Sequence, residues 1–367
     1  MNFIEEFIKG QQGKNFGLTT GLSKFDRAIG GIQRKAIYGV AASPKAGKTT
    51  FVDQCFVIEP YLYHISNKEK NLDIDWIYFS FEIDRIKKEF KYAASFFYRD
   101  YGLSEFTYND NVYEISSNYL LGKMQDDLGN IIPVNTAHKE ILKEIYYNKI
   151  IPLFGEYDKK GKKIKSGTID FIEEKTNPTG IRNYLLNYAK NNGEFIFEEY
   201  EIVDNGVKIK KKRISGYRPN NPDKYTIIIL DHIRKMNFER GFSMKENIDK
   251  MLSYQCELRN WCGFTFVDVA HMNRSLANTE RIKFMAEQLY PTGDDIKDSG
   301  NLSEDCDFLI TLFNPQDEKY GIKKHFGLDL ENYPKYRSIH LVESIDTECP
   351  IHLRSNMYGN INLFKQI

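Results

Sequence analysis

The sequence lacks long apolar runs, paired cysteines and any excess of charge. No apolar stretch approaches the roughly 18 residues that a membrane-spanning helix needs, and the first residues, MNFIEEFIKGQQGKN, are too polar for a signal peptide. The five cysteines are odd in number and show neither a CxxC pair nor metal-ligand spacing, which argues against a disulfide framework and is typical of a reducing compartment. We therefore expect a cytoplasmic protein with no membrane partner.

The balance of charge is even, with 51 Lys and Arg against 51 Asp and Glu, so any nucleic-acid contact must come from a local patch. With 367 residues, of which 41% are hydrophobic, the chain can fill one large α/β core or two smaller ones. No internal repeat or low-complexity linker is visible, which favours one elaborated domain.

An apolar run from Ile37 to Ala42 is followed by a loop and then by apolar residues at helical spacing. A phosphate-binding loop has the pattern G-x-x-x-x-G-K-[ST], and here only the first glycine is replaced, by Ala42. Backbone N–H groups at such a junction bind phosphate, and the helix dipole adds favourable potential. The expected nucleotide-binding residues are Ser43, Pro44, Lys45, Ala46, Gly47, Lys48, Thr49 and Thr50.

Within this loop, Lys48 is expected to reach the β- and γ-phosphates of ATP, and Thr49 to ligate Mg²⁺. The loss of the first glycine is tolerable if Ala42 keeps strand dihedrals, because the close approach to phosphate is made at Gly47. The alternative is a surface turn with a solvated lysine. The flanking strand and helix patterns favour the nucleotide site.

Three further predicted strands each end in a polar side chain. IIILDHI (227–233) predicts a strand buried on both faces and contains Asp231, the expected metal ligand. IYFSFEID (77–84) contains Glu82, which can deprotonate an attacking water. A third strand leads to His271, which can contact the γ-phosphate, although taken alone this histidine is better explained as structural. Open parallel sheets bind ligands at such strand ends, so the coincidence favours one shared site.

Taken in order, these motifs resemble the ATPase domain of DnaB-like replicative helicases, hexameric motors with the RecA fold. TTGLSKFDRAIGGI (19–32) resembles the segment before the first core strand of that family, and VAHMNRS (269–275) resembles its sensor strand, where His occurs in phage members. The resemblance implies an α/β fold: a RecA-like P-loop NTPase core with a mainly parallel twisted sheet, helices on both faces and an α/β-hairpin elaboration. It also implies a phage-type member, and hence the cytoplasm of a host.

The stretch PTGDDIKDSGNLSEDCDFLITL (291–312) resembles the family's loop with a D-L-R-E-S-G core, which lines the central channel and holds single-stranded DNA by its phosphates. Without the resemblance it would read as a plain acidic turn. A lysine side chain and a glycine amide suit phosphate contacts that do not read sequence. The expected DNA-binding residues are Lys297, Asp298, Gly300, Lys235 and Arg274.

One departure from the family concerns its Lys-x-Arg, whose basic groups reach the ATP site of the next subunit. The matching positions here are Glu343 and Ile345. A cation at that place accelerates phosphoryl transfer by several orders of magnitude. Either Arg354 or Arg337 substitutes, or hydrolysis is slow, or the protein does not work as a ring.

The expected organisation is a linker or tail at 1–16 and a RecA-like ATPase domain at 17–367, with an insertion at about 90–220. Residues 1–16 are equally well interpreted as a remnant of a docking helix or as a frayed terminus. Within the insertion we expect mainly helical structure over 85–150, hairpins in 156–174 and 195–219, and a helix in 176–193. Five basic residues between Lys208 and Arg213 could contact nucleic acid, but a solvated hairpin arm is favoured.

The resemblance therefore implies an ATP-dependent DNA helicase or translocase with an expected 5′–3′ direction, which uses ATP and Mg²⁺. It also implies a homo-oligomer, a hexameric ring if the helicase interpretation holds, with replication proteins as further partners. The first alternative is a RecA-like DNA-binding ATPase without unwinding activity, such as a loader, recombination mediator or regulator. Ile345 favours it, because this residue stands where the family has the arginine that reaches the next subunit, the finger position. The second is a structural protein that keeps nucleotide for stability. A metabolic P-loop kinase is disfavoured, because no acceptor-binding signature is visible.

Overall fold

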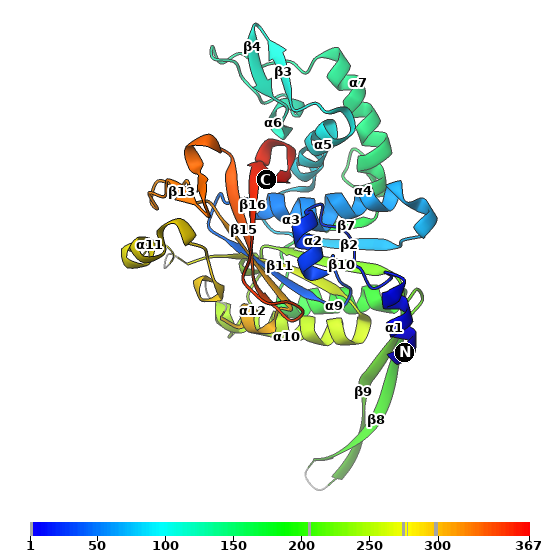
Figure 1. Cartoon of the computed structure of the whole chain (residues 1–367). Coiled ribbons are helices and arrows are strands. Elements are labelled where there is room, and N and C mark those ends of the chain that lie inside the picture. Colours follow the sequence, from blue (N-terminus) through cyan, green and yellow to red (C-terminus); the bar gives the residue numbers. More distant parts are fainter. Residues whose placement is uncertain (1–2, 205–206, 274–275, 277, 297–299) are drawn as a thin grey trace.

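The computed structural model of the chain describes residues 3–204, 207–273, 276, 278–296 and 300–367. Within these residues a central sheet runs through the molecule (Figure 1). Its strands, in spatial order, are β17 (Leu363–Gln366), β16 (Ile351–Tyr358), β15 (Tyr336–Ser344), β12 (Phe308–Phe313), β1 (Ile37–Ala42), β11 (Thr265–His271), β10 (Tyr225–Asp231), β2 (Ile74–Ser80) and β7 (Ile169–Ile172).

The strands from β12 to β7 are parallel to their neighbours, whereas β15, β16 and β17 extend the sheet in antiparallel fashion. Parallel strands end at a common edge of the sheet. At that edge Ala42 of β1 is paired with His271 of β11, and Asp231 of β10 is paired with Ser80 of β2. The register therefore brings the ends of the four predicted strands together.

Helices cover both faces of the sheet, and each face has its own apolar core. One face carries α3 (Lys48–Val52), the π-helical η1 (Asp53–Ile58), α4 (Glu59–Ser66) and α5 (Arg85–Tyr101), and the other carries α9 (Pro178–Asn191), α10 (Met244–Cys262) and α12 (Gly300–Asp305). Figure 1 shows these two layers above and below the strands. The predicted α/β architecture, a mainly parallel sheet between two helical layers, is confirmed.

The sequence of β10 is almost continuously apolar because the strand is buried on both faces. Every residue from Tyr225 to Asp231 is buried, because β10 lies between β2 and β11 with helices on both faces. The helix that follows, α10, starts with a capping box in which Ser243 and Glu246 satisfy each other's backbone N–H groups. Its apolar side chains at positions 248, 251, 252 and 258 are buried against the sheet, as their spacing predicted.

Residues 85–150 are mainly helical, as expected, but they also contain a hairpin. The structure has α6 (Ser117–Leu120), α7 (Thr136–Ile145), the π-helical η3 (Tyr146–Ile150) and α8 (Ile151–Phe154), but also a hairpin of β3 (Glu105–Tyr108) and β4 (Asn111–Glu114). Asn109 and Asp110 turn this hairpin with φ of 48° and 61°, as a two-residue loop of type I′ requires. The hairpin at 105–114 was not predicted, because local turn chemistry decides the structure there.

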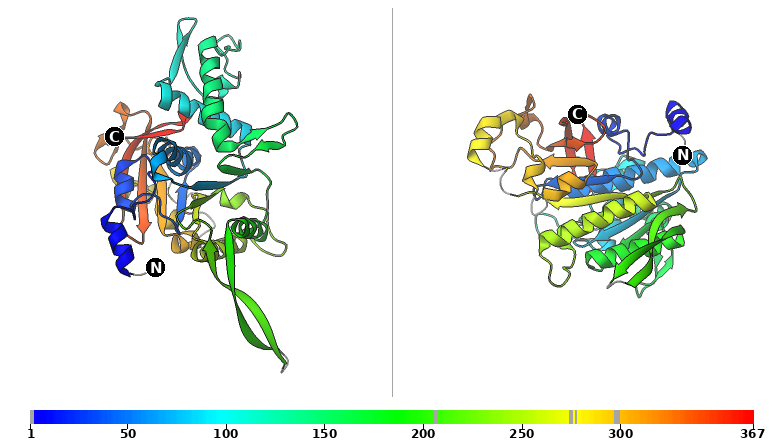
Figure 2. Two further views of the ribbon diagram at one scale, coloured as in Figure 1. Left: turned by 90° about the vertical axis from the view of Figure 1, so that its right-hand side faces the viewer. Right: turned by 90° about the horizontal axis from the view of Figure 1, so that it is seen from below.

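The remaining predicted elements of the insertion are present. A short hairpin of β5 (Glu156–Tyr157) and β6 (Lys163–Lys165) precedes β7, which unexpectedly joins the central sheet beside β2. A long hairpin of β8 (Gly193–Asp204) and β9 (Val207–Pro219) extends away from the body of the molecule (Figures 1 and 2). Its basic strand is paired with an acidic one: Lys208 with Glu201, Lys212 with Glu199 and Arg213 with Glu198. This pairing fits the solvated arm better than a nucleic-acid contact.

The C-terminal strands pack on the phosphate loop. The backbone of Phe364 in β17 exchanges two hydrogen bonds with the side chain of Gln54, and the Gln54 Nε2 donates to the Phe364 carbonyl at 3.0 Å. Elements outside the layers are α1 (Phe3–Gln11), α2 (Ser23–Ile29), η2 (Lys68–Lys70), η4 (Ile233–Lys235), α11 (Thr279–Met285), η6 (Ala286–Gln288), η7 (Gly293–Asp295), β13 (Lys324–His325), β14 (Leu328–Asp329), η8 (Leu330–Asn332) and η9 (Gly359–Ile361).

Helix α1 has no buried residue, and it leaves Phe3, Phe7 and Ile8 exposed on its surface. Among the described helices, none combines the length and the apolar composition needed to cross a bilayer.

Candidate active site

The phosphate loop leaves β1 at Ala42, which is a regular strand residue paired on both sides, and enters α3 at Lys48. Gly47 has a φ of 98°, a conformation that favours glycine. A Cβ atom there would lie 2.3 Å from Met357 Sδ and 2.8 Å from a ring carbon of Phe364. The glycine is thus required both by its own backbone and by the C-terminal strands that pack against it.

The side chain of Lys48 is buried at the carboxyl edge of the sheet. Its Nζ donates to the carbonyl oxygens of Ala42 at 3.0 Å and Ser43 at 3.3 Å, and contacts His271 Nδ1 at 3.0 Å. Burial lowers the pKa of Lys48 to about 8, while the nearby carboxylates of Asp231 and Glu82 oppose this shift. The loop, the strand ends and both acids are therefore within electrostatic reach of one ammonium group.

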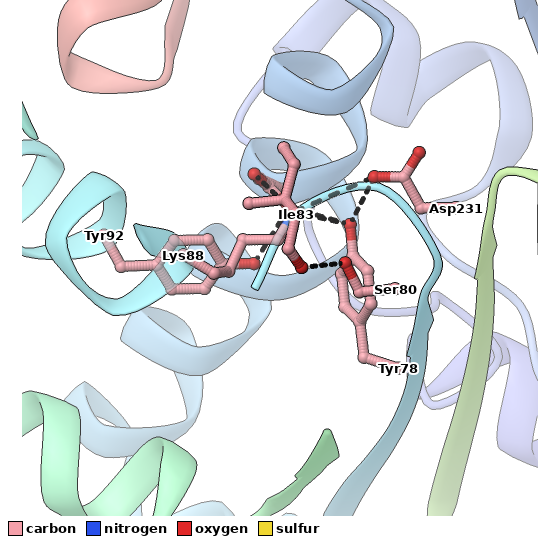
Figure 3. A network of polar contacts seen from close by, with 7 residues as sticks. Tyr78, Ser80, Ile83, Lys88, Tyr92 and Asp231 are labelled. Atoms are coloured by element: carbon pink, nitrogen blue, oxygen red, sulfur yellow. Dashed lines mark hydrogen bonds and ion pairs between the residues drawn. The ribbon is translucent and has the colours of Figure 1, made fainter. Parts of the chain in front are cut away.

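Asp231 lies at the end of β10 in a buried polar network (Figure 3). The Tyr78 hydroxyl lies 3.1 Å from Asp231 Oδ2, and Lys88 Nζ lies 3.8 Å from the same oxygen. Burial raises the pKa of Asp231, and the ammonium of Lys88 opposes that rise. Figure 3 shows the Lys88 side chain pointing toward Tyr78, with Tyr92 behind it.

Lys88 itself is fully buried and forms an ion pair with the fully buried Asp53. Its Nζ lies 2.8 and 3.1 Å from the two Asp53 oxygens and 2.8 Å from the Tyr78 hydroxyl, and Tyr92 also donates to Asp53. Sequence reasoning missed this pair. An available signal was an aspartate within the otherwise apolar helical stretch FVDQCFVI.

Glu82, His232 and His271 form a cluster beside Lys48, with one ligand atom of each lying within 4.8 Å of the others. Three such groups have the count of a metal site. However, Nδ1 of His232 accepts the backbone N–H of Arg234 at 3.3 Å, and Nδ1 of His271 faces the ammonium of Lys48. The other ring nitrogen then carries the hydrogen, so the cluster offers N–H donors rather than two metal ligands.

His232 is a further residue of this cluster that was not predicted from the sequence, although it directly follows Asp231 in IIILDHI. It is buried, and its ring packs edge-to-face against that of His271 with centroids 4.2 Å apart. Burial, together with the positive charge of the nearby Lys48, lowers the pKa of His232 to about 3. The ring is therefore neutral at physiological pH.

The residues predicted to bind DNA are only partly described. Lys297, Asp298 and Arg274 lie outside the described residues, and Gly300 begins α12. Lys235 lies in η4 with its Nζ 3.8 Å from Glu82 Oε1, so it is near the same carboxylate as His232. The segment that precedes Lys297 is tied to the end of β11: Asn273 N donates to Asp295 O at 2.7 Å, and Met272 forms a bridge with Ile296.

The finger position of the family falls far from this edge. The Ile345 backbone N–H donates to Asp307 O, whose own N–H binds Ile37 at the start of β1, and the Ile345 side chain is 69% exposed. Arg337 is at the opposite end of β15, paired with Ser355, and is part-buried. Arg354 is exposed on β16.

The side chains at the carboxyl edge have the chemistry that ATP and Mg²⁺ require. A loop before a helix offers backbone N–H groups to phosphate, and Lys48 adds a cation. Thr49 and Asp231 offer a hydroxyl and a carboxylate, the oxygen donors that Mg²⁺ prefers. When bound, Mg²⁺ neutralises charge on the β- and γ-phosphates.

No protein-family model matches the chain, and no curated protein matches it in sequence. Solved structures do match over nearly its whole length. An ATPase domain aligns with a TM-score of 0.57 and 15% identity, covering 99% of this chain and 96% of that one. A DnaB-like replicative helicase, solved in a study of its interactions with primase, aligns with a TM-score of 0.60 and 13% identity over 99% of this chain.

The chain has the fold of a DnaB-like helicase ATPase domain. The resemblance seen in its motifs is thus confirmed at the level of the RecA-like fold. This chain spans 64% of the length of the DnaB-like helicase it matches.

Proposed function

We propose that this protein is a Mg²⁺-dependent ATPase of the DnaB-like helicase class that translocates on single-stranded DNA and unwinds duplex DNA in replication. The observation that carries the proposal is the convergence of Lys48, Glu82, Asp231 and His271 at one edge of the sheet, with Lys48 and His271 in direct contact and both acids acting on Lys48. Four strand ends that are distant in sequence supply these groups, as an NTPase site needs.

In this proposal each residue has one role. The loop 43–50 binds the phosphates, Lys48 contacts the β- and γ-phosphates, and Thr49 and Asp231 hold the metal. Glu82 accepts the proton of the attacking water, and its side chain is 41% exposed, so solvent can reach it. Without nucleotide, His271 contacts Lys48. When ATP binds, the γ-phosphate replaces Lys48 as the partner of His271.

The residues that follow His271 are proposed to couple ATP hydrolysis to DNA binding. Met272 and Asn273 are bonded to Ile296 and Asp295, directly before the predicted DNA-binding residues Lys297, Asp298 and Gly300. A shift of His271 on loss of the γ-phosphate would therefore move the segment that leads into this loop. Arg274 and Lys235 are the other proposed DNA contacts.

A homo-oligomer, with six subunits if the chain works as a ring, is part of the proposal. The exposed apolar side chains of α1 are suited to a contact with a second copy, because Phe3 and Phe7 share one face of the helix with Ile8 and form a contiguous apolar stripe. Replication proteins such as a primase are proposed partners, since the DnaB-like helicase of similar fold was solved in a study of its interactions with one.

The test is ATP hydrolysis with and without single-stranded DNA, using the wild type and Lys48→Ala. The wild type should hydrolyse ATP faster with DNA, and Lys48→Ala should abolish turnover. Lys160→Ala, a change of an exposed lysine in the β5–β6 turn, is the matched control. Undiminished hydrolysis by Lys48→Ala would refute the assigned site.

A forked duplex then separates the motor from a RecA-like ATPase that does not unwind. Strand displacement that needs a 5′ tail supports a 5′–3′ helicase, and hydrolysis without displacement supports the loader, mediator or regulator. The native mass with ATP and an oligonucleotide gives the number of subunits, and a stable monomer would contradict the ring.

A further inference from the structure

His232 follows the proposed metal ligand Asp231, and its ring orientation is fixed by the backbone. Its Nδ1 accepts the N–H of Arg234 at 3.3 Å, so this side chain caps the short helix η4. An imidazole nitrogen that accepts a hydrogen bond carries no hydrogen, and the neutral ring then carries it on Nε2. The local fold therefore selects the tautomer with an Nε2–H donor.

This donor points toward Glu82. His232 Nε2 lies 3.8 Å from Glu82 Oε1, a separation too long for a direct hydrogen bond. A polar pair at this separation is suited to a bridging water that hydrogen bonds to both atoms. Such a water would accept from Nε2–H and donate to the carboxylate, which fixes its orientation and leaves one lone pair for attack.

We propose that His232 is a further catalytic residue, which holds the attacking water against Glu82; the inference rests on the proposed ATPase function. The water oxygen forms a bond to the γ-phosphorus of ATP while the bond from that phosphorus to the β–γ bridging oxygen breaks. ADP leaves with the electron pair, and the proton of the water passes to Glu82. His232 keeps its Nε2 hydrogen throughout and acts only as a donor.

His232 is better placed than Lys235 to hold the water beside Glu82. Lys235 Nζ is also 3.8 Å from Glu82 Oε1, but its side chain is 49% exposed and has four rotatable carbons. His232 is 2% exposed and packed against His271. A donor held in place by packing and by a backbone hydrogen bond needs no rearrangement when the water arrives.

Two substitutions distinguish the role of Nδ1, which accepts the Arg234 N–H, from the role of Nε2, which donates to the water. In His232→Asn the side-chain amide can replace Nδ1 and accept the Arg234 N–H, but no donor reaches the Nε2 position. In His232→Gln the longer amide restores a donor there. We expect His232→Asn to lower kcat by about 100-fold with the ATP dissociation constant unchanged, as for loss of one preorganised donor, and His232→Gln to retain most of the activity.

A binding measurement complements turnover. ADP with aluminium fluoride mimics the transition state together with its in-line water, whereas ADP with beryllium fluoride mimics bound ATP. His232→Asn should bind the aluminium fluoride complex about 100-fold more weakly and the beryllium fluoride complex equally well. Equal loss of affinity for both would show that His232 only supports the fold of the site, and would overturn the proposal.

The tautomer can be read in the wild type, independently of how any variant folds. Histidine labelled with ¹⁵N should show His232 protonated at Nε2 and not at Nδ1, and the reverse would overturn the inference. Wild-type turnover in His232→Asn would overturn it too, while leaving the ATPase function intact if Lys48→Ala is inactive. If Lys48→Ala still hydrolyses ATP, the proposed function fails and the role of His232 fails with it.

Discussion

Asp268 provides a test of how this fold treats a buried charge. It lies in the central strand β11, fully buried, and Gln255 Nε2 donates to its Oδ1 at 2.9 Å. Within the described chain, neither Asp268 Oδ2 nor Gln255 Oε1 has a hydrogen-bond partner. Burial raises the pKa of Asp268 to about 7, and a proton on Oδ2 is suited to the unpaired amide oxygen.

The raised pKa of Asp268 determines how the free energy of unfolding changes with pH, both in sign and in size. An aspartate in the unfolded chain has a pKa of about 3.9, so the unfolded state releases its proton at a lower pH than the folded state. Stability therefore falls as the pH rises from about 4 to about 7 and is constant above. A difference of about three pH units corresponds to about 4 kcal/mol at pH 8, and to about 1 to 2 kcal/mol at pH 5.

Asp268→Asn removes the charge and keeps a donor and an acceptor for Gln255. We expect the free energy of unfolding of this variant to exceed that of the wild type by about 4 kcal/mol at pH 8 and by about 1 to 2 kcal/mol at pH 5. Urea denaturation followed by far-ultraviolet circular dichroism at several pH values measures this difference.

Asp307→Asn is the matched control, because Asp307 is held in an ion pair: Arg259 Nη1 donates to both of its oxygens, at 2.9 and 3.0 Å, and the Ile37 N–H donates to one at 2.7 Å. That change should destabilise the protein. A variant Asp268→Asn that is no more stable than the wild type at pH 8, or a gain that does not change with pH, would refute the reasoning.

Two further changes test features of the site. Lys88→Met should lower the free energy of unfolding, measured by urea denaturation, by about 3 to 5 kcal/mol, because it leaves the buried Asp53 without its ion-pair partner. Adding Asp53→Leu should recover most of that loss. Equal stability of Lys88→Met and the wild type would contradict this expectation. Gly47→Ala should abolish binding of a fluorescent ATP analogue, because its Cβ would collide with the C-terminal strands, whereas Gly129→Ala, with a similar φ of 83° and no atom within 4 Å of the new Cβ, should bind normally. Normal binding by Gly47→Ala would contradict the packing seen at the loop.

The sequence predicted the parts of the fold that depend on local patterns. The apolar runs of β1 and β10 are buried strands because both faces of the sheet are covered, and Gly47 is where the phosphate loop needs a left-handed residue. The Asn109-Asp110 turn was also readable, since two such residues between alternating side chains favour a hairpin. It was overlooked in favour of helix.

Other features depend on contacts that no sequence pattern displays. The ion pair of Lys88 and Asp53 joins residues on separate helices, and the tautomer of His232 depends on one backbone N–H two residues away. The place of β7 beside β2 depends on how the insertion folds back onto the sheet edge. The ion pair and the place of β7 result from tertiary packing, which overrides local propensity, whereas the His232 tautomer results from a local backbone contact.

The packing of β17 on the phosphate loop has a consequence for biosynthesis. Gln54, in the helical segment that follows this loop, and Phe364 are 310 positions apart, so a ribosome must complete most of the polypeptide before this wall of the proposed nucleotide site can form. Contacts between such distant positions form late, because a long segment must be ordered first. An incomplete nascent product would therefore lack a finished pocket, and ATP would selectively stabilise molecules whose translation has passed position 364.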